Sequence, residues 1–258
     1  MKPFKEIALF IGLPLLFIAM AAFSHINRQQ MVSRIQQDST TRGFAVVELF
    51  TSEGCWSCPP ADALIEKLQR DNNNSQLYIM AFHVDYWDHQ GWKDRFSKSA
   101  FTDRQKQYAA WLRLSTIYTP QVVINGQTEM VGSDESSVLS GIRSALQEAS
   151  ASNLTIRATV AGKEAVISYT GIAADASTHI LVALVQKNAS SQVAAGENAG
   201  KQLTHVQIVR ALEQQPLQAQ GQVSVGLPRD FRPGAWEVVA FVQQSATGKI
   251  TQAAKADL

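Results

Sequence analysis

The first half of the chain alternates short apolar runs with a stretch of helical spacing. Residues 45–50 (AVVELF) and residues 77–84 (LYIMAFHV) are apolar runs of strand length. Between them, apolar positions recur at helical spacing up to Leu68, after Pro59 and Pro60, which suit the first turn of a helix. The pattern therefore predicts a strand, a helix and a second strand.

The next stretch continues this alternation of helices and strands. A helix is predicted after Thr102, whose hydroxyl can cap it. Residues 121–124 and 128–131 predict two short strands, and the Asn-Gly pair between them is a strong hairpin signal. Asp134, or the serine before it, can cap a last helix. This part of the chain therefore predicts an α/β unit.

From Ser152 onward the pattern changes to strands alone. Apolar and polar residues alternate, as expected for a strand with one buried face, and Gly, Pro, Asn and Ser clusters separate the runs. Seven short strands of this kind predict a β-sandwich. The predicted strands are residues 154–160, 165–169, 180–185, 206–212, 223–227, 236–242 and 250–253.

These patterns divide the chain into four segments. Residues 1–23 combine a lysine-bearing start with a long uncharged apolar run, which predicts a signal peptide or an uncleaved membrane anchor. Residues 24–43 are polar and are predicted to be a linker. Residues 44–150 form the predicted α/β domain, and residues 151–258 form the predicted β-sandwich domain. Export places both domains in the periplasm or another extracytoplasmic space.

Composition and charge narrow the possible functions. The chain has 258 residues, of which 45% are hydrophobic and 17% charged, so it can bury a large core. The formal net charge is +1 and no basic patch stands out, which argues against nucleic acid as a partner.

The two cysteines of the chain stand three residues apart. Cys55 and Cys58 lie in the stretch FTSEGCWSCPPA, after a predicted strand and before a predicted helix. At a helix N-terminus, unpaired N–H groups and the helix dipole favour thiolate over thiol. The spacing and the place in the chain therefore predict a redox-active dithiol, with Cys55 as the attacking and more exposed sulfur and Cys58 as the resolving one.

The order of these elements resembles the thioredoxin fold. More closely, the motifs VELFTSEGCWSCPPAD, FHVDYWD, YTPQVVINGQ and GENAG resemble the DUF1223 family of exported bacterial proteins. The resemblance implies a thioredoxin-like α/β domain, an export signal and a thiol–disulfide role, which we expect to act on protein thiols or a redox partner protein. The expected fold is this α/β domain followed by the all-β domain that the strand pattern predicts. The resemblance implies no cofactor.

The resemblance also assigns roles to single residues. Pro120 is expected to follow a cis peptide bond, with Thr119 beside the groove in which a partner chain would lie. Glu48 is the candidate for a buried carboxylate that shuttles a proton, although it is one residue out of register.

Three further residues are candidates for binding or for tuning the dithiol. Trp56 lies between the two cysteines. His83 and Asp85 end a strand that we expect to finish on the same side as the dithiol.

Other interpretations of the same residues stay open. Cys55, Cys58 and His83 together could hold copper or zinc, which would make the protein a metal-binding module. The cysteines could instead form a purely structural disulfide in a redox-inert interaction protein. Residues 196–200 (GENAG) either close a sheet, or they bring Glu197, Asn198 or His205 over the dithiol.

Overall fold

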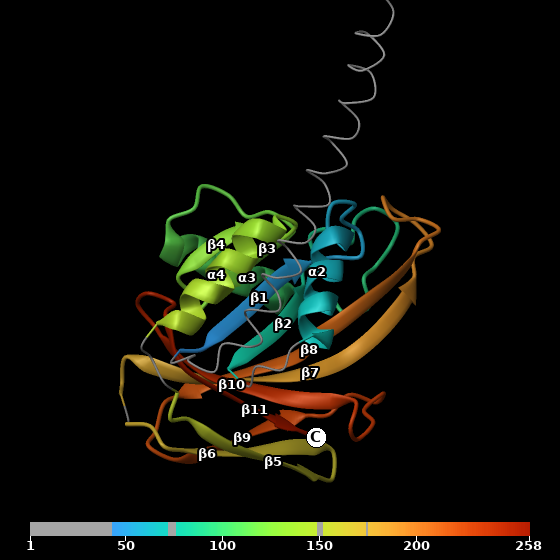
Figure 1. Cartoon of the computed structure of the whole chain (residues 1–258). Coiled ribbons are helices and arrows are strands. Elements are labelled where there is room, and N and C mark those ends of the chain that lie inside the picture. The colour runs from blue at the N-terminus through green and yellow to red at the C-terminus, as the bar shows by residue number, and fades with distance from the viewer. Residues whose placement is uncertain (1–42, 72–75, 149–151, 174) are drawn as a thin grey trace, which may run out of the picture. The chain divides into compact units, whose positions relative to one another are not determined.

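Eleven strands and three helices make up the part of the chain that the structure, a computed structural model, describes: residues 43–71, 76–148, 152–173 and 175–258 (Figure 1). The helices are α2 (Pro59–Arg70), α3 (Ser99–Leu112) and α4 (Glu135–Gln147). The strands are β1 (Ala45–Thr51), β2 (Leu77–His83), β3 (Gln121–Ile124), β4 (Thr128–Val131), β5 (Thr155–Ala161), β6 (Glu164–Thr170), β7 (Thr178–Gln192), β8 (Gln202–Pro216), β9 (Gly221–Gly226), β10 (Trp236–Gln244) and β11 (Ile250–Asp257).

One mixed sheet of eight strands runs through both halves of the chain. Its order is β11-β10-β7-β8-β2-β1-β3-β4, and β5, β6 and β9 form a separate sheet of three strands. The two halves join where β2 and β8 pair in parallel, at Ala81 and Ile208. Figure 1 shows β7 and β8 continuing the sheet that begins with β1 and β2.

The expectation of a thioredoxin-like α/β domain followed by an all-β sandwich domain is wrong. Strands from both halves share the eight-stranded sheet, and strand residues clearly outnumber helical ones among the described residues. Local periodicity predicts where a strand lies but not which strand pairs with it. The pairing of β2 with β8 could therefore not be predicted from the sequence pattern. The seven strands predicted after Ser152 are all present.

Two hydrophobic cores lie on opposite faces of the long strands. Along β7, Leu181 and Ala183 belong to a core shared with β1, β2 and α3, whereas Val182 and Leu184 belong to a core shared with β5, β6 and β9. Successive side chains of a strand point to opposite faces, so one strand can serve both cores. The three-stranded sheet therefore covers β7 and β10 on the face away from α3.

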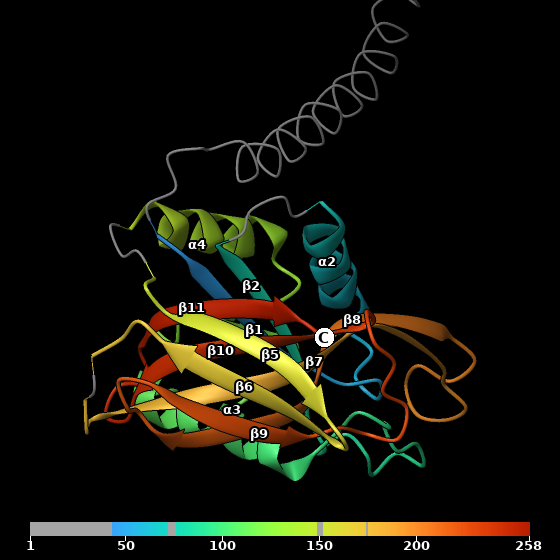
Figure 2. The ribbon, with the colours of Figure 1, turned by 90° about the horizontal axis from the view of Figure 1, so that it is seen from below.

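The same alternation determines which side chains of β1 face α2, the helix that follows the cysteines, and which face α3. Thr51 donates a hydrogen bond to Asp62 of α2 at 2.9 Å, whereas Glu48 pairs with Arg104 of α3 at 2.5 Å. Figure 2 shows α2 and α4 on one side of these strands and α3 on the other. Glu48 and α2 consequently lie on opposite faces of the sheet.

Two of the three predicted caps and turns are confirmed. The Asp134 carboxylate accepts a hydrogen bond from the Ser137 N–H at 3.1 Å and caps α4. Asn125 and Gly126 turn between β3 and β4 with φ values of 50° and 67°. Thr102 does not cap α3, because that helix begins at Ser99, and the Thr102 hydroxyl instead bonds to Asp85.

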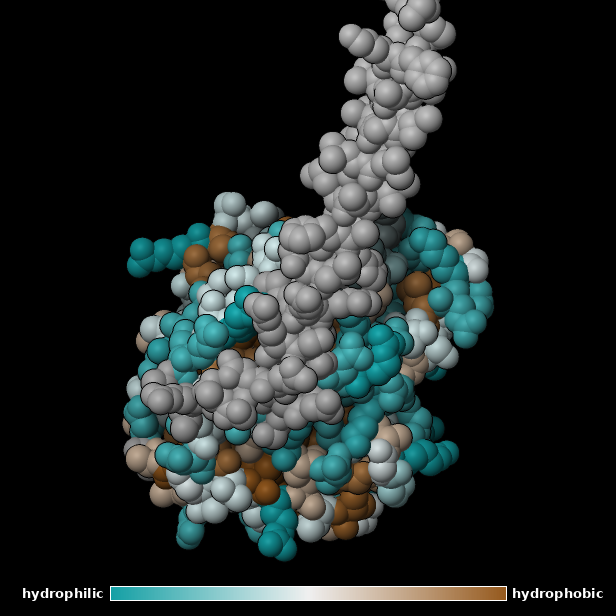
Figure 3. Space-filling model, in the orientation of Figure 1, coloured by the Kyte–Doolittle hydropathy of each residue, from teal (hydrophilic) through white to brown (hydrophobic). Residues whose placement is uncertain are grey.

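The predicted signal or anchor segment, residues 1–23, and residues 24–42 of the predicted linker lie outside the described residues. No helix in the described part of the chain is long and apolar enough to cross a membrane. Outside the grey atoms, the face in Figure 3 carries small separate hydrophobic patches among hydrophilic residues. Trp56, which is 67% exposed, is the most exposed large apolar side chain described.

Candidate functional site

Cys55 and Cys58 are joined by a disulfide bond at the start of α2. Their Cα atoms are 5.4 Å apart, and Cys58 is the N-cap residue of the helix, followed directly by the two prolines. Both cysteines are fully buried, so the expectation that Cys55 is the more exposed sulfur is wrong. The cause is that loops from other parts of the chain pack around the CxxC loop, residues 53–58.

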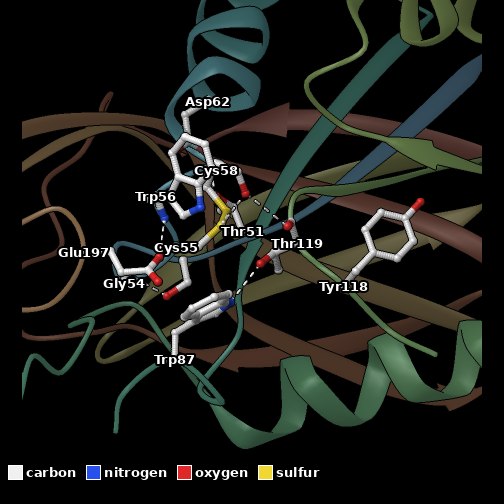
Figure 4. The surroundings of a disulfide bond; sticks show 12 residues. Thr51, Gly54, Cys55, Trp56, Cys58, Asp62, Trp87, Tyr118, Thr119 and Glu197 are labelled. Carbon is white, nitrogen blue, oxygen red and sulfur yellow. Dashed lines mark hydrogen bonds between the residues drawn. A yellow bond between two sulfur atoms is a disulfide. The ribbon is translucent and has the colours of Figure 1, made fainter. Parts of the chain in front are cut away.

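The first of these loops carries the Thr119–Pro120 peptide bond, which is cis as predicted. The Ser57 hydroxyl, 3.4 Å from the Cys55 sulfur, donates to the Thr119 carbonyl at 3.5 Å. The Thr119 hydroxyl accepts a hydrogen bond from the Trp87 indole at 2.8 Å. Figure 4 shows Thr119 and Trp87 on the same side of the disulfide.

Trp87 also limits the space beside the CxxC loop. A Cβ atom added at Gly54 would lie 2.9 Å from the Trp87 Cβ, closer than side chains normally approach. Glycine is therefore required at position 54 by close packing. Trp87 itself packs against the core shared by β1, β2 and α3, which fixes this side of the site.

The second loop is the tip of the β7–β8 hairpin, residues 193–201, which we call the hairpin tip. The buried Asn198 amide donates to the carbonyls of Glu53 and Cys55, each at 2.9 Å. The exposed Glu197 carboxylate accepts the Trp56 backbone N–H at 3.0 Å (Figure 4). Of the two interpretations of residues 196–200, the structure supports the one that brings them to the cysteines.

Five buried titratable side chains meet at the start of the CxxC loop and behind it. We call them the acid–histidine cluster: Glu53, Asp62, His83, Asp94 and His205. The rings of His83 and His205 meet edge to face at 4.8 Å. His205 lies between two acids, with Nε2 at 3.4 Å from Glu53 and Nδ1 at 3.7 Å from Asp62.

A short hydrogen bond sets the charge state of one pair in this cluster. His83 Nδ1 lies 2.6 Å from an Asp94 oxygen, which also accepts the Glu53 N–H at 2.9 Å. Burial would raise the pKa of Asp94, but the charge of His83 and these hydrogen bonds outweigh it and lower the pKa to about 2. Burial would likewise lower the pKa of His83, but the Asp94 charge and hydrogen bond raise it. The two form an ion pair.

Asp62 has the opposite tendency. Burial raises the pKa of its carboxyl, and the charges of His205 and His83 with the Thr51 hydrogen bond offset this only in part. Asp62 stands one helical turn after Cys58, and its N–H bonds to the Cys58 carbonyl at 3.1 Å. The carboxyl group closest in sequence to Cys58 therefore has a raised pKa.

The structure gathers some of the predicted site residues and separates others. Trp56 and Thr119 lie at the disulfide, and His83 lies in the cluster behind it. Asp85 bonds to Thr102 at the start of α3 instead. Glu48 is held by Arg104 and by the Tyr108 hydroxyl on the far face of the sheet, so it is not beside the cysteines.

The alternative metal site made of Cys55, Cys58 and His83 has no geometric support. The two sulfurs are bonded to each other, and His83 Nδ1 is bonded to Asp94. In the described part of the chain, no group of three or more His, Cys, Asp and Glu side chains is arranged to hold a metal ion.

Sequence reasoning missed Asp62, Asp94 and Ser57. A signal existed for Asp62, which is a charged residue among the buried positions Ala61, Leu64 and Ile65 of an otherwise amphipathic helix. For Asp94 there was no comparable signal, because the loop between β2 and α3 is polar and aromatic throughout.

The charge of Asp94 gives a testable pH dependence. Because its folded pKa of about 2 lies below the ordinary value near 4, its ionisation stabilises the folded protein above about pH 4. This stabilisation is lost as the pH falls towards 2. Between pH 5 and pH 2 the free energy of unfolding in urea should fall by about 2–3 kcal/mol more for wild type than for Asp94→Asn. Asp103→Asn, at an exposed ion pair, serves as the control and should follow wild type; equal pH profiles for Asp94→Asn and wild type would contradict the ion pair.

Fold and site together define a mostly β protein that carries a CxxC disulfide, enclosed by loops, at one end of a mixed sheet. The family described as protein of unknown function (DUF1223) matches residues 46–243. The chain therefore belongs to the DUF1223 family. A comparison with curated proteins gave no match.

Two solved structures share the fold. Protein AGR_C_4864 of Agrobacterium tumefaciens is 24% identical, with a TM-score of 0.63, over 86% of this chain and 95% of that one. HBP35 of Porphyromonas gingivalis is 14% identical, with a TM-score of 0.59, over 84% of this chain and 75% of that one. At these identities the likeness concerns the fold alone.

Proposed function

We propose that this protein is an exported thiol–disulfide oxidoreductase that acts on protein thiols through Cys55 and Cys58. The observation that carries the proposal is the CxxC disulfide at the N-cap of α2, with the exposed Trp56 between its cysteines. Cross-linking a loop of four residues removes little entropy from the unfolded chain. As a purely structural bond, this disulfide would therefore stabilise the folded protein only slightly.

The surroundings of the disulfide support the same proposal. The helix dipole at the start of α2 favours a thiolate on cleavage of the bond. The dipole acts without free N–H groups, because Pro59 and Pro60 carry none and the next two N–H groups bond to the Cys58 carbonyl. Asp62, whose pKa burial raises, offers a proton-exchanging group one turn away from Cys58. Export is supported by the apolar N-terminal segment of the sequence and by disulfide chemistry, which persists in oxidising compartments.

Disulfide transfer to a test substrate checks this proposal. The oxidised protein is mixed with a peptide that carries two thiols, the reaction is quenched with an alkylating agent, and masses are recorded. We expect the peptide to gain a disulfide as Cys55 and Cys58 become alkylated. A native protein that keeps its disulfide while the peptide stays reduced, with either partner in excess, would contradict the proposal.

A further inference from the structure

The hairpin tip holds one peptide group of the CxxC loop from both ends. The Cys55 carbonyl and the Trp56 N–H belong to the same peptide group, and they bond to Asn198 and Glu197, which are themselves neighbours in sequence. A side-chain amide and a side-chain carboxylate thus clamp the backbone that joins the first cysteine to Trp56. The clamp bridges more than 140 residues of sequence.

Most contacts that attach the hairpin tip are polar, and its one large buried apolar side chain is Val193, directly after β7. The Glu197 N–H donates to the side-chain oxygen of Gln90 at 3.3 Å, and within the tip the Lys201 ammonium donates to the side-chain oxygen of Asn198 at 2.9 Å. Among the described residues, neither hydrophobic core contains a side chain of the hairpin tip. When the segment opens, these hydrogen bonds are replaced by bonds to water at small net cost, so residues 194–201 can detach without exposing either hydrophobic core.

The β2–α3 loop, which carries Trp87, cannot detach in this way. Trp87 packs on the core, bonds to Thr119 and approaches Gly54 within close contact. Displacing it would expose apolar surface and break the packing behind the disulfide. Compared with the β2–α3 loop that carries Trp87, the hairpin tip is the segment that opens at lower cost.

Thiol–disulfide exchange requires the loops around the disulfide to open. The inference that follows rests on the proposed function. Both cysteines are 0% exposed, and thiol–disulfide exchange needs an attacking sulfur to reach one of the bonded sulfurs. We propose that the hairpin tip is the gate of this site, and that release of the clamp by Glu197 and Asn198 admits an extended polypeptide segment carrying a cysteine. Once Glu197 has left, the Trp56 N–H at the rim is free to bond a carbonyl of that segment.

The gate is tested with a small reductant, so that no partner protein is needed. The rate of disulfide reduction by dithiothreitol is measured for the native protein and for a peptide of residues 50–61. We expect the native protein to react at least about 100-fold more slowly than the peptide. Glu197→Ala should react about two- to tenfold faster than wild type, and Asn198→Ala tenfold or more, since each lost hydrogen bond shifts opening by roughly this factor. Glu197→Gln keeps the acceptor for Trp56 and should stay within about twofold of wild type.

The urea dependence of these rates separates a gate from general destabilisation. Local opening exposes little surface, so the rate should rise only weakly with urea below the unfolding transition. The gate would be overturned by a urea dependence as steep as that of global unfolding, or by a native protein that reacts as fast as the peptide. Rates of Glu197→Ala and Asn198→Ala equal to that of wild type would also overturn it. None of these results bears on whether the disulfide transfers to a dithiol peptide, so the gate and the oxidoreductase function fail separately.

Discussion

Cys58→Ser is expected to hold a partner thiol on Cys55 as a lasting mixed disulfide, whereas Cys55→Ser is not. In both variants disulfide transfer to a dithiol peptide should fall by more than about 100-fold, since the second sulfur can no longer complete the exchange. The difference arises because Cys55 precedes the exposed Trp56, and its sulfur lies 3.4 Å from the Ser57 hydroxyl that bonds to Thr119. Cys58 instead caps α2, and its carbonyl accepts the N–H of Asp62 from the acid–histidine cluster.

The adduct is measured by mass spectrometry after mixing each variant with a peptide that carries an activated disulfide. Ser57→Ala, which removes the hydroxyl 3.4 Å from the Cys55 sulfur but keeps both cysteines, is the control and should leave no lasting adduct. Accumulation of the adduct on Cys58 in Cys55→Ser, with none in Cys58→Ser, would reverse the assignment of the attacking sulfur.

Glu48→Gln is expected to lower the free energy of unfolding by about 3–5 kcal/mol without slowing exchange in the folded protein. Glu48 is fully buried and bonds to Arg104 through both oxygens, so the variant leaves a buried guanidinium without its counter-charge. The reaction should be unaffected because Glu48 faces α3, whereas the cysteines lie on the side of α2.

Urea unfolding and the peptide transfer assay measure these two effects independently. Glu66→Gln removes a carboxylate from an exposed pair with Arg70 and should change stability by less than about 1 kcal/mol. If Glu48→Gln slowed exchange while stability stayed unchanged, Glu48 would be the proton shuttle that its place before the cysteines first indicated.

Periodicity in the sequence was sufficient to find the strands and helices, because the signal for each lies within the element itself. Periodicity was insufficient to predict which strands pair in the sheet. Nothing in the sequence around Ile208 indicates that it pairs with Ala81. This pairing joins strands of the two expected domains into one continuous sheet. Long-range pairing depends on which surfaces fit together, and a single sequence does not record that.

The site shows the same division between local and distant signals. The CxxC spacing and Pro120 were readable because each is a local motif, and the cis bond is confirmed. Glu48 was misplaced because a shift of one residue along a strand moves a side chain to the other face of the sheet. Asn198 was one of several candidates in a loop, and only the length of the β7–β8 hairpin brings it to Cys55.

The proposed function requires that Cys55 and Cys58 cycle between disulfide and dithiol in the folded protein. The direct measurement is a redox titration in buffers of defined thiol–disulfide ratio, with free thiols counted by the mass gained on alkylation and the fold followed by circular dichroism. We predict a reversible two-electron transition, with zero and two labels at its ends and an unchanged spectrum throughout. A disulfide that no buffer reduces unless the protein unfolds would contradict the proposed function. Thiols that do not reoxidise would also contradict it.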